Sequence, residues 1–223
     1  MATIGLDKLF YAKITEDASG NETYGTPVQL AKAIEADLAV ELLEAILYAD
    51  DGADVAIKEF KNGTLTLGID NIGVQTAQDL TGATLDSNGV LVSTGEDSPQ
   101  PVAIGFRAKN AHGHYRYFWL YRVVFGIPGA NLKTRGDSIE FSTPSIEGTI
   151  IRRNKVDGAG KHPWKVEVTE GDTGVSASVI SGWFEAVYEP SYSVVQEQNN
   201  NNNNNNGNPD PEPTEIIPGG GSN

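Results

Sequence analysis

The sequence predicts a mainly β fold with a short helix at about 74–81, a late helix at about 175–187 and a flexible C-terminal tail. Alternating apolar and polar residues recur along the first 190 residues, as is typical of strands with one buried face. Two Asn-Gly pairs, Asn62-Gly63 and Asn88-Gly89, lie between alternating segments, and both residue types accept the positive φ of a type I′ turn. Each pair therefore predicts a β-hairpin.

The first half of the body is expected to hold strands joined by turns. LFYAKITE at 9–16 alternates, and residues 17–27, with Gly20 and Gly25, form a loop that is long for a hairpin. Residues 30–42 also alternate and are interpreted as a strand. The segment AIEADLAVELLEAILYA contains strong helix formers, so strand versus helix stays open for 34–48. VQTAQDLTG predicts the short helix, which Gly82 ends.

The second half contains the clearest strand, HYRYFWLYRVVF at 114–125. Every second residue from Tyr115 to Phe125 is aromatic or apolar, which places one wholly apolar face against a core. The other face mixes apolar and cationic residues and suggests partial cover, for example by another subunit. SIEGTII and WKVEV predict two further strands. Val175, Val179, Trp183 and Val187 recur every four residues, which favours an amphipathic late helix that Pro190 ends.

The chain divides by composition near residue 190. Residues 1–190 have the composition of a globular domain, whereas 191–223 contain eight consecutive asparagines, alternating prolines and a triple glycine. Such a segment cannot bury enough apolar surface to offset the entropy lost on ordering. We therefore expect a β-domain at 1–190 and a low-complexity tail or linker at 191–223, flexible from residue 196 onward.

Charge and composition exclude several classes of function. The chain has no cysteine, which removes disulfides, thiolate metal sites and cysteine nucleophiles. No signal peptide and no apolar stretch of membrane-spanning length is recognisable, so no membrane contact is expected. The net charge is −14, and residues 1–106 hold 17 acidic and 5 basic groups. An acidic surface repels DNA, which argues against tight nucleic-acid binding but suits DNA that must slide past.

Three aspartates, Asp50, Asp51 and Asp54, lie beside Gly52 and invite comparison with a calcium loop. In an EF-hand register, positions 1, 3 and 5 would be Asp50, Gly52 and Asp54, but position 6 is valine and position 12 is lysine. The loop fails that pattern. Asp-Gly between two apolar segments instead predicts a turn between strands.

The remaining motifs are equally weak as sites. His112 and His114 could share a metal on one strand face, but they flank Gly113, and the third histidine, His162, is distant in sequence; a hairpin tip is favoured. Gly160-Lys161 lacks the first glycine and the Ser/Thr of a P-loop. No G-x-S-x-G occurs. We predict no catalytic, cofactor-binding or metal-binding residue and no enzymatic activity.

An ordered set of segments spans about residues 1–190: LYADDG, FKNGTLTLGID, LTG, VAIGFRAK, YRYFWLYRVVF and WFEAVYEP. In this order they resemble the major tail proteins, or tail tube proteins, of long-tailed phages with non-contractile tails, particularly those of phages that infect Gram-positive bacteria. The resemblance implies a β-sandwich or barrel flanked by a helix. It also implies hexameric rings that stack into a tube.

Further expectations follow from the resemblance. The tube would enclose a tape-measure protein, contact tail tip and terminator proteins, and let DNA pass without tight binding. The protein would lie in the virion tail, and in the host cytoplasm during assembly. Acidic residues of 1–106 would suit the lumen, and the loop at 17–27 would be an arm to a neighbouring subunit. The alternative function is a non-enzymatic β-sandwich module for adhesion or glycan binding.

Overall fold

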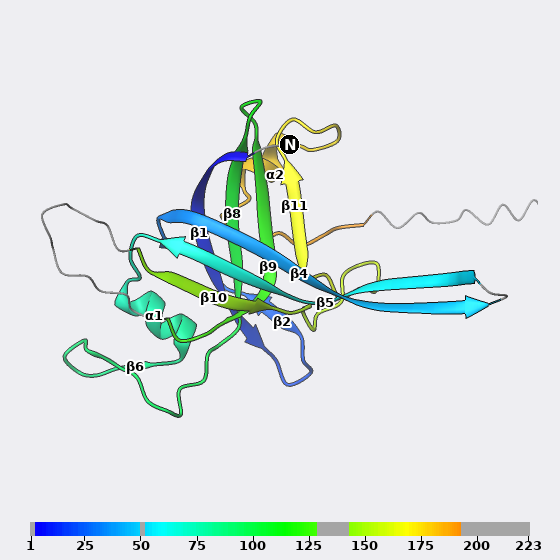
Figure 1. Ribbon diagram of the computed structural model, residues 1–223. Coiled ribbons are helices and arrows are strands. Elements are labelled where there is room, and N and C mark those ends of the chain that lie inside the picture. Colours follow the sequence, from blue (N-terminus) through cyan, green and yellow to red (C-terminus); the bar gives the residue numbers. More distant parts are fainter. Residues whose placement is uncertain (1–2, 50–51, 129–142, 193–223) are drawn as a thin grey trace, which may run out of the picture. The chain divides into compact units, whose positions relative to one another are not determined.

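The computed structural model describes residues 3–49, 52–128 and 143–192, with backbone alone at 48–49 and 52–54 (Figure 1). By its contacts the chain divides into two units, Met1–Tyr192 and Ser193–Asn223. The first unit is the body described below. The predicted flexible segment from residue 196 onward, together with Asp50 and Asp51, lies outside the described residues.

The expectation of a mainly β fold is confirmed. The strands are β1 (Thr3–Glu16), β2 (Glu22–Tyr24), β3 (Val28–Ala31), β4 (Ala33–Ala49), β5 (Gly52–Ile69), β6 (Thr84–Leu85), β7 (Leu91–Val92), β8 (Val102–Asn110), β9 (Tyr115–Phe125), β10 (Ser145–Ile150) and β11 (Lys165–Thr169). The helices are α1 (Val74–Thr81) and α2 (Ala177–Ser181). One nine-stranded sheet has the order β2-β1-β8-β9-β10-β5-β4, with β3 beside β1 and β11 beside β9.

The sheet bends so that its two halves face each other across a core. In Figure 1, β4, β5 and β10 cross the direction of β8, β9 and β11. Leu9 of β1, Leu65 of β5, Ile104 of β8 and Ile150 of β10 are fully buried in one apolar cluster between the halves. This sandwich-like arrangement buries the inner face of each half without closing the sheet into a complete barrel.

A second apolar cluster covers the opposite face of β1, β8 and β9. Tyr117, Trp119 and Tyr121 pack there against Trp183, and the Trp119 indole N–H donates to the Trp183 carbonyl at 2.9 Å. The middle of the sheet is therefore buried on both sides. Gly105 permits this packing, because a Cβ there would lie 2.7 Å from the Trp119 ring.

The prediction that every second residue of 115–125 lies on one face is correct up to Tyr121. Beyond it the prediction is wrong, because Val123 and Phe125 are buried on the opposite face. Ile104 of β8 pairs with Leu120, but Val102 pairs with Val123, so β9 contains one extra residue between them. This bulge exchanges the two faces, and Val123 joins the inter-half cluster instead of the second one. On the other face of β9, Leu120 is buried in the inter-half cluster whereas Phe118 is only partly buried, so cover of this face by another subunit stays a prediction.

The Asn62-Gly63 hairpin prediction is wrong, whereas the Asn88-Gly89 prediction is confirmed. Asn62 and Gly63 lie inside β5, opposite Glu41 and Val40 of β4, and the chain reverses between Ala49 and Gly52. A Cβ at position 63 would lie 2.9 Å from the Ala39 carbonyl oxygen, so the glycine serves a close approach of strands. At the second pair, β6 and β7 do form a hairpin, with Gly89 at φ 78°.

The two predicted helices differ in outcome. The helix at 74–81 is confirmed as α1, and Gly82, at φ 76°, caps it by donating its N–H to the Gln78 carbonyl. The late helix is wrong in length, because α2 covers only Ala177–Ser181. Trp183 and Val187 are nevertheless buried in the second cluster, so their spacing reflects burial along an irregular segment.

The first half contains one further correction and one resolved ambiguity. Residues 33–49 form a strand, which settles 34–48 in favour of β structure. Residues 17–27 are not an open loop, because β2 pairs antiparallel with Ile14–Glu16 of β1. Asp17 holds the intervening turn by accepting N–H donors from Ser19 and Asn21. Its carboxyl pKa is lowered by these hydrogen bonds.

Candidate assembly surfaces

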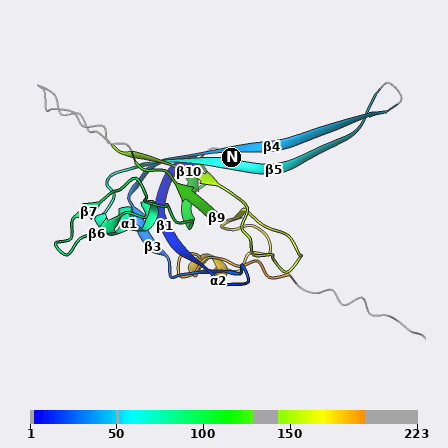
Figure 2. The same ribbon diagram turned by 90° about the horizontal axis from the view of Figure 1, so that it is seen from below.

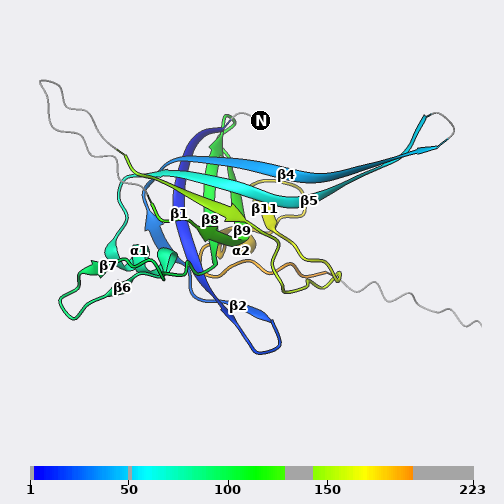
Figure 3. The ribbon, with the colours of Figure 1, turned by 60° about the horizontal axis from the view of Figure 1, so that its bottom comes forward.

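Strands β4 and β5 continue well past the body as a two-stranded ribbon. Figures 2 and 3 show this ribbon leaving the remainder of the sheet. We call residues 42–59 the arm; it begins where Lys61 bulges out of the pairing between Glu41–Asn62 and Leu42–Phe60. All arm side chains that the structure describes are exposed. A two-stranded ribbon without further contacts is marginally stable in water.

The arm carries a strongly apolar face. Directly opposite residues share a face of a ribbon, and three such pairs are Leu43–Glu59, Ala45–Ile57 and Leu47–Val55. Leu43 is 53% exposed and Leu47 is 60% exposed. Apolar side chains gathered on an exposed ribbon are a hallmark of an interaction surface, and a free monomer gains nothing from them.

The other face of the arm is more polar. Glu44 pairs with Lys58 at 3.1 Å across the ribbon, between the pairs Leu42–Phe60 and Ile46–Ala56. Phe60 anchors the base of the arm by stacking on Trp164 with ring centroids 4.4 Å apart. The arm is thus fixed at one end only, and it presents two faces of different chemistry.

The outer side of β10, β5 and β4 forms an exposed acidic face. Rows of neighbouring residues cross the three strands: Ser145–Gly68–Glu35, Glu147–Thr66–Asp37 and Thr149–Thr64–Ala39. The alternate residues, including Leu65, Leu67 and Ile146, point inward and are buried. We call the nine residues of these rows the acidic face. It contains carboxylates, hydroxyls and small residues, and no basic residue.

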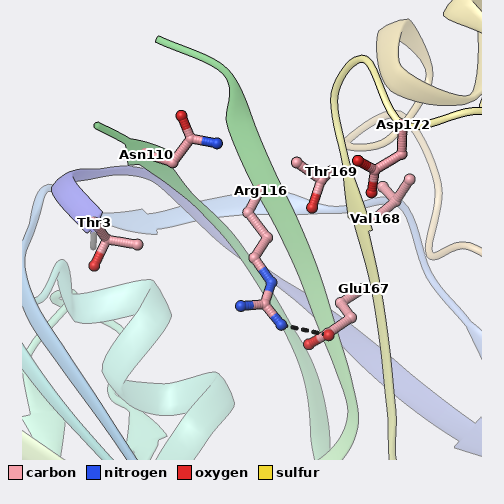
Figure 4. A pocket seen from close by; sticks show the side chains of 7 residues that line it. All are labelled: Thr3, Asn110, Arg116, Glu167, Val168, Thr169 and Asp172. Carbon is pink, nitrogen blue, oxygen red and sulfur yellow. Dashed lines mark hydrogen bonds and ion pairs between the residues drawn. The ribbon is translucent and has the colours of Figure 1, made fainter. Parts of the chain in front are cut away.

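A polar pocket of about 240 Å³ lies between the tip of the β8–β9 hairpin and β11 (Figure 4). Its lining is Thr3, Asn110, Arg116, Glu167, Val168, Thr169 and Asp172. Arg116 pairs with Glu167, and Lys165 approaches the same carboxylate at 2.7 Å. Burial alone would raise the pKa of Glu167, but these two cations outweigh it and lower the pKa. A carboxylate held ionised in this way is a poor proton shuttle.

The histidines occupy the places expected of loop residues. His112 and His114 flank Gly113, at φ 92°, and their backbone N–H groups donate to the Asn110 side-chain oxygen. The predicted hairpin tip is therefore confirmed. His162 lies in another loop, with Nδ1 3.1 Å from the Arg153 carbonyl oxygen. Within residues 3–49, 52–128 and 143–192, no group of three or more His, Asp or Glu residues could hold a metal ion.

The remaining sequence motifs are the aspartates beside Gly52 and the Gly160-Lys161 pair. Asp54 lies on β5, close to the chain reversal, and the other two aspartates of its cluster fall outside the described residues. Gly160-Lys161 belongs to a turn in which the Asp157 carboxylate accepts N–H donors from Ala159 and Lys161. No helix follows this turn, as a phosphate-binding loop would require; the next element is β11.

Sequence reasoning missed a buried ionic network near the ends of β1 and β9. Glu22 and Arg153 are fully buried, and Glu22 accepts from the Arg122 guanidinium. Arg153 pairs with Glu189 at 2.9 Å and packs over the Tyr121 ring. Alternation along the strands could have placed Glu22 on the buried side of β2. The cations of the network, Arg122 and Arg153, lie about 100 residues or more away in the sequence, so no local pattern pairs them with it. This network holds the hairpin of β2 and the segment around Glu189 against the body.

No protein-family model matches the chain, and no curated protein matches it. Among the described residues, no helix has the length and apolar character needed to cross a membrane.

Proposed function

We propose that this chain is a structural subunit of a phage tail tube, which assembles into stacked hexameric rings. The observation that carries the proposal is the arm, an exposed apolar ribbon on an otherwise well-packed body. Fully burying an exposed Leu, Ile or Val contributes roughly 1.5–3 kcal/mol, and the arm's apolar side chains, which are about half exposed, would each contribute about half of that. Several of them together favour association with further copies. The ordered segments that resemble tail tube proteins support the same function.

In this proposal the acidic face lines the lumen of the tube. Its three strands present Glu35, Asp37 and Glu147 to solvent among threonines and serines, without a cation. Such a face repels phosphates and lets DNA move past.

As a tail tube subunit the protein would have binding partners and a location in the virion, and it would catalyse no reaction. The partners are further copies of the chain, a tape-measure protein inside the tube, and the tail tip and terminator proteins at its ends. The protein acts in the virion tail and is assembled in the host cytoplasm. It needs no cofactor. A glycan-binding module is less well supported, because Trp119 and Trp183 are buried instead of exposed for sugar stacking.

Assembly of the purified protein tests the proposal. A Leu43→Asp, Leu47→Asp variant should remain folded, because both side chains are already exposed, and should form no tubes. Negative-stain microscopy and sedimentation velocity measure this against the wild type. Glu44→Gln, on the more polar face of the arm, is the matched control and should assemble. A wild-type protein that stays monomeric at high concentration, even beside a tape-measure partner, would overturn the proposed function.

A second test addresses the lumen. Replacing Asp37 and Glu147 by lysine should leave tubes intact and slow DNA ejection, because phosphates would then bind the lumen wall. The two substitutions are introduced into the phage, and DNA release is followed with an intercalating dye. Ejection at the wild-type rate would exclude this face as the lumen wall.

A further inference from the structure

A second exposed apolar feature lies where the bent sheet fails to close. Between the start of β1 and the first half of β4 runs a groove with a volume of about 450 Å³. Its apolar lining includes Ile4, Leu6, Ile34, Leu38, Phe106 and Phe118. Ile4 is 67% exposed and Ile34 is 53% exposed, so the body leaves this groove uncovered. We call it the seam groove.

Both long walls of the seam groove have free backbone edges. Along Thr3–Asp7, β1 pairs with β8 on one side, and its pairing with β3 starts only at Leu9. On the other wall, β4 pairs with β5 alone among the described strands. Unpaired N–H and C=O groups beside an apolar trough are the features by which a sheet accepts an added strand or ribbon.

The arm fits this groove in shape and chemistry. The segment Leu43–Leu47, whose residues Leu43, Ala45 and Leu47 share the apolar face, is about 16 Å long at 3.3 Å per residue. The wall Thr3–Lys8 is about 20 Å long. The arm is already in β conformation, and Leu43, Leu47 and Ile57 are exposed on one of its faces. The arm can therefore cover the apolar lining of the seam groove with its own apolar side chains. Because it is already a β-ribbon, docking costs little additional conformational entropy.

The positions of the arm and the seam groove decide whether the groove binds the arm of its own chain or that of a second copy. Ile34 and Leu38 stand near the start of β4, whereas the arm is its far end, directed away from the body (Figures 2 and 3). A continuous strand cannot fold its end back onto its own beginning, so the occupant must be a second copy. Complementary surfaces at opposite ends of one molecule form a head-to-tail contact, which builds an open stack wherever the rotation between copies does not close a ring.

We propose that the arm of one copy docks in the seam groove of the next copy and thereby stacks the rings. This inference rests on the proposed self-assembly and adds its receptor site. Leu43, Leu47 and Ile57 of the arm cover Ile4, Ile34 and Phe106 of the groove. Every copy uses its arm once and its groove once, which gives the stack a single direction.

Cysteine cross-linking tests the contact directly, because the natural chain contains no cysteine. A Leu43→Cys variant is mixed with an Ile34→Cys variant under assembly conditions and mildly oxidised. We expect a covalent dimer that contains one copy of each variant. The matched control pairs Leu43→Cys with Thr149→Cys on the acidic face and should give little dimer. Equal yields in the two mixtures, or dimer only in the control, would overturn the proposed contact.

A second measurement separates this inference from the proposed function. An Ile4→Glu, Ile34→Glu variant changes two exposed side chains and should fold normally. Its critical concentration for tube growth should rise at least roughly tenfold, because the burial lost at the two side chains together amounts to about one fully buried isoleucine. Tubes that form at the wild-type critical concentration would refute the groove as receptor while leaving the tail tube function standing. A wild type without any tubes would instead remove the proposed function itself.

Discussion

Removing the Glu22 carboxylate should strongly destabilise the body. Glu22 is fully buried on β2 and accepts hydrogen bonds from the backbone N–H groups of Asn154, at 3.1 Å, and Lys155, at 3.4 Å. It also binds the Arg122 guanidinium, whose side chain is only 15% exposed. In Glu22→Ala, all three donors lose this acceptor at once.

The expected loss of stability in Glu22→Ala follows from the Arg122 guanidinium, which stays buried without its partner. Breaking a buried ion pair by removing one partner costs about 3–5 kcal/mol, because an uncompensated charge remains inside. Arg122 Nε already lacks a partner among the described groups, and the remaining carboxylate, Glu16, lies 3.6 Å away and is 40% exposed. Glu16 and water relieve part of the cost, so we expect about 3 kcal/mol. That is a large share of a typical stability of 5–15 kcal/mol.

Urea denaturation of the monomer, followed by tryptophan fluorescence, measures this loss. The matched control is Glu16→Ala, which removes a more exposed carboxylate from the same network and should cost no more than about 1 kcal/mol. If Glu22→Ala lost less than about 1 kcal/mol, or no more than the control, the buried network would not anchor β2.

Three further predictions concern packing, pH and the tail. Gly148→Ala should cost roughly 1–3 kcal/mol in thermal melts, because its Cβ would lie 2.7 Å from Val123, whereas Gly95→Ala, with nothing within 4 Å, should change stability by less than about 0.5 kcal/mol. Burial would raise the pKa of Asp79, but hydrogen bonds from Lys13 and Tyr11 outweigh it and lower the pKa. The ionised carboxylate therefore stabilises the fold fully above the unfolded-state pKa of about 3.9. The difference in unfolding free energy between wild type and Asp79→Asn should shrink as the pH falls through the lowered pKa of the folded state. A difference that stays constant with pH in urea titrations would contradict this. Deleting residues 196–223 should leave tubes intact by electron microscopy, and failed assembly would give the tail a structural role.

Local signals of the sequence predicted much of the fold correctly. The alternation at 115–125 identified β9, and Gly82 and the Asn88-Gly89 pair marked a helix end and a turn, because each depends on a few adjacent residues. The rejection of Gly160-Lys161 as part of a phosphate-binding loop had the same local basis. None of these signals involves a partner far away in the chain.

The surfaces that carry the proposals could not be predicted in this way. FKNGTLTLGID looked like a hairpin, yet Gly63 is glycine because the Ala39 carbonyl approaches it from β4. The arm exists because β4 and β5 remain paired for longer than the body can cover them, and pattern alone could not distinguish its exposed leucines from core leucines. The seam groove requires β1 and β4, which are not paired with each other, to stand side by side.

By itself, the sequence determined a β-rich body, an acidic first half and the absence of cysteine chemistry, because composition and nearest-neighbour preferences suffice for these. Only the tertiary structure decided which face of each strand is buried. One extra residue in β9 exchanges its faces, and pairing across 100 residues buries Glu22 beside Arg122. Register and long-range pairing arise from the whole chain at once, and the arm, the acidic face and the seam groove follow from them.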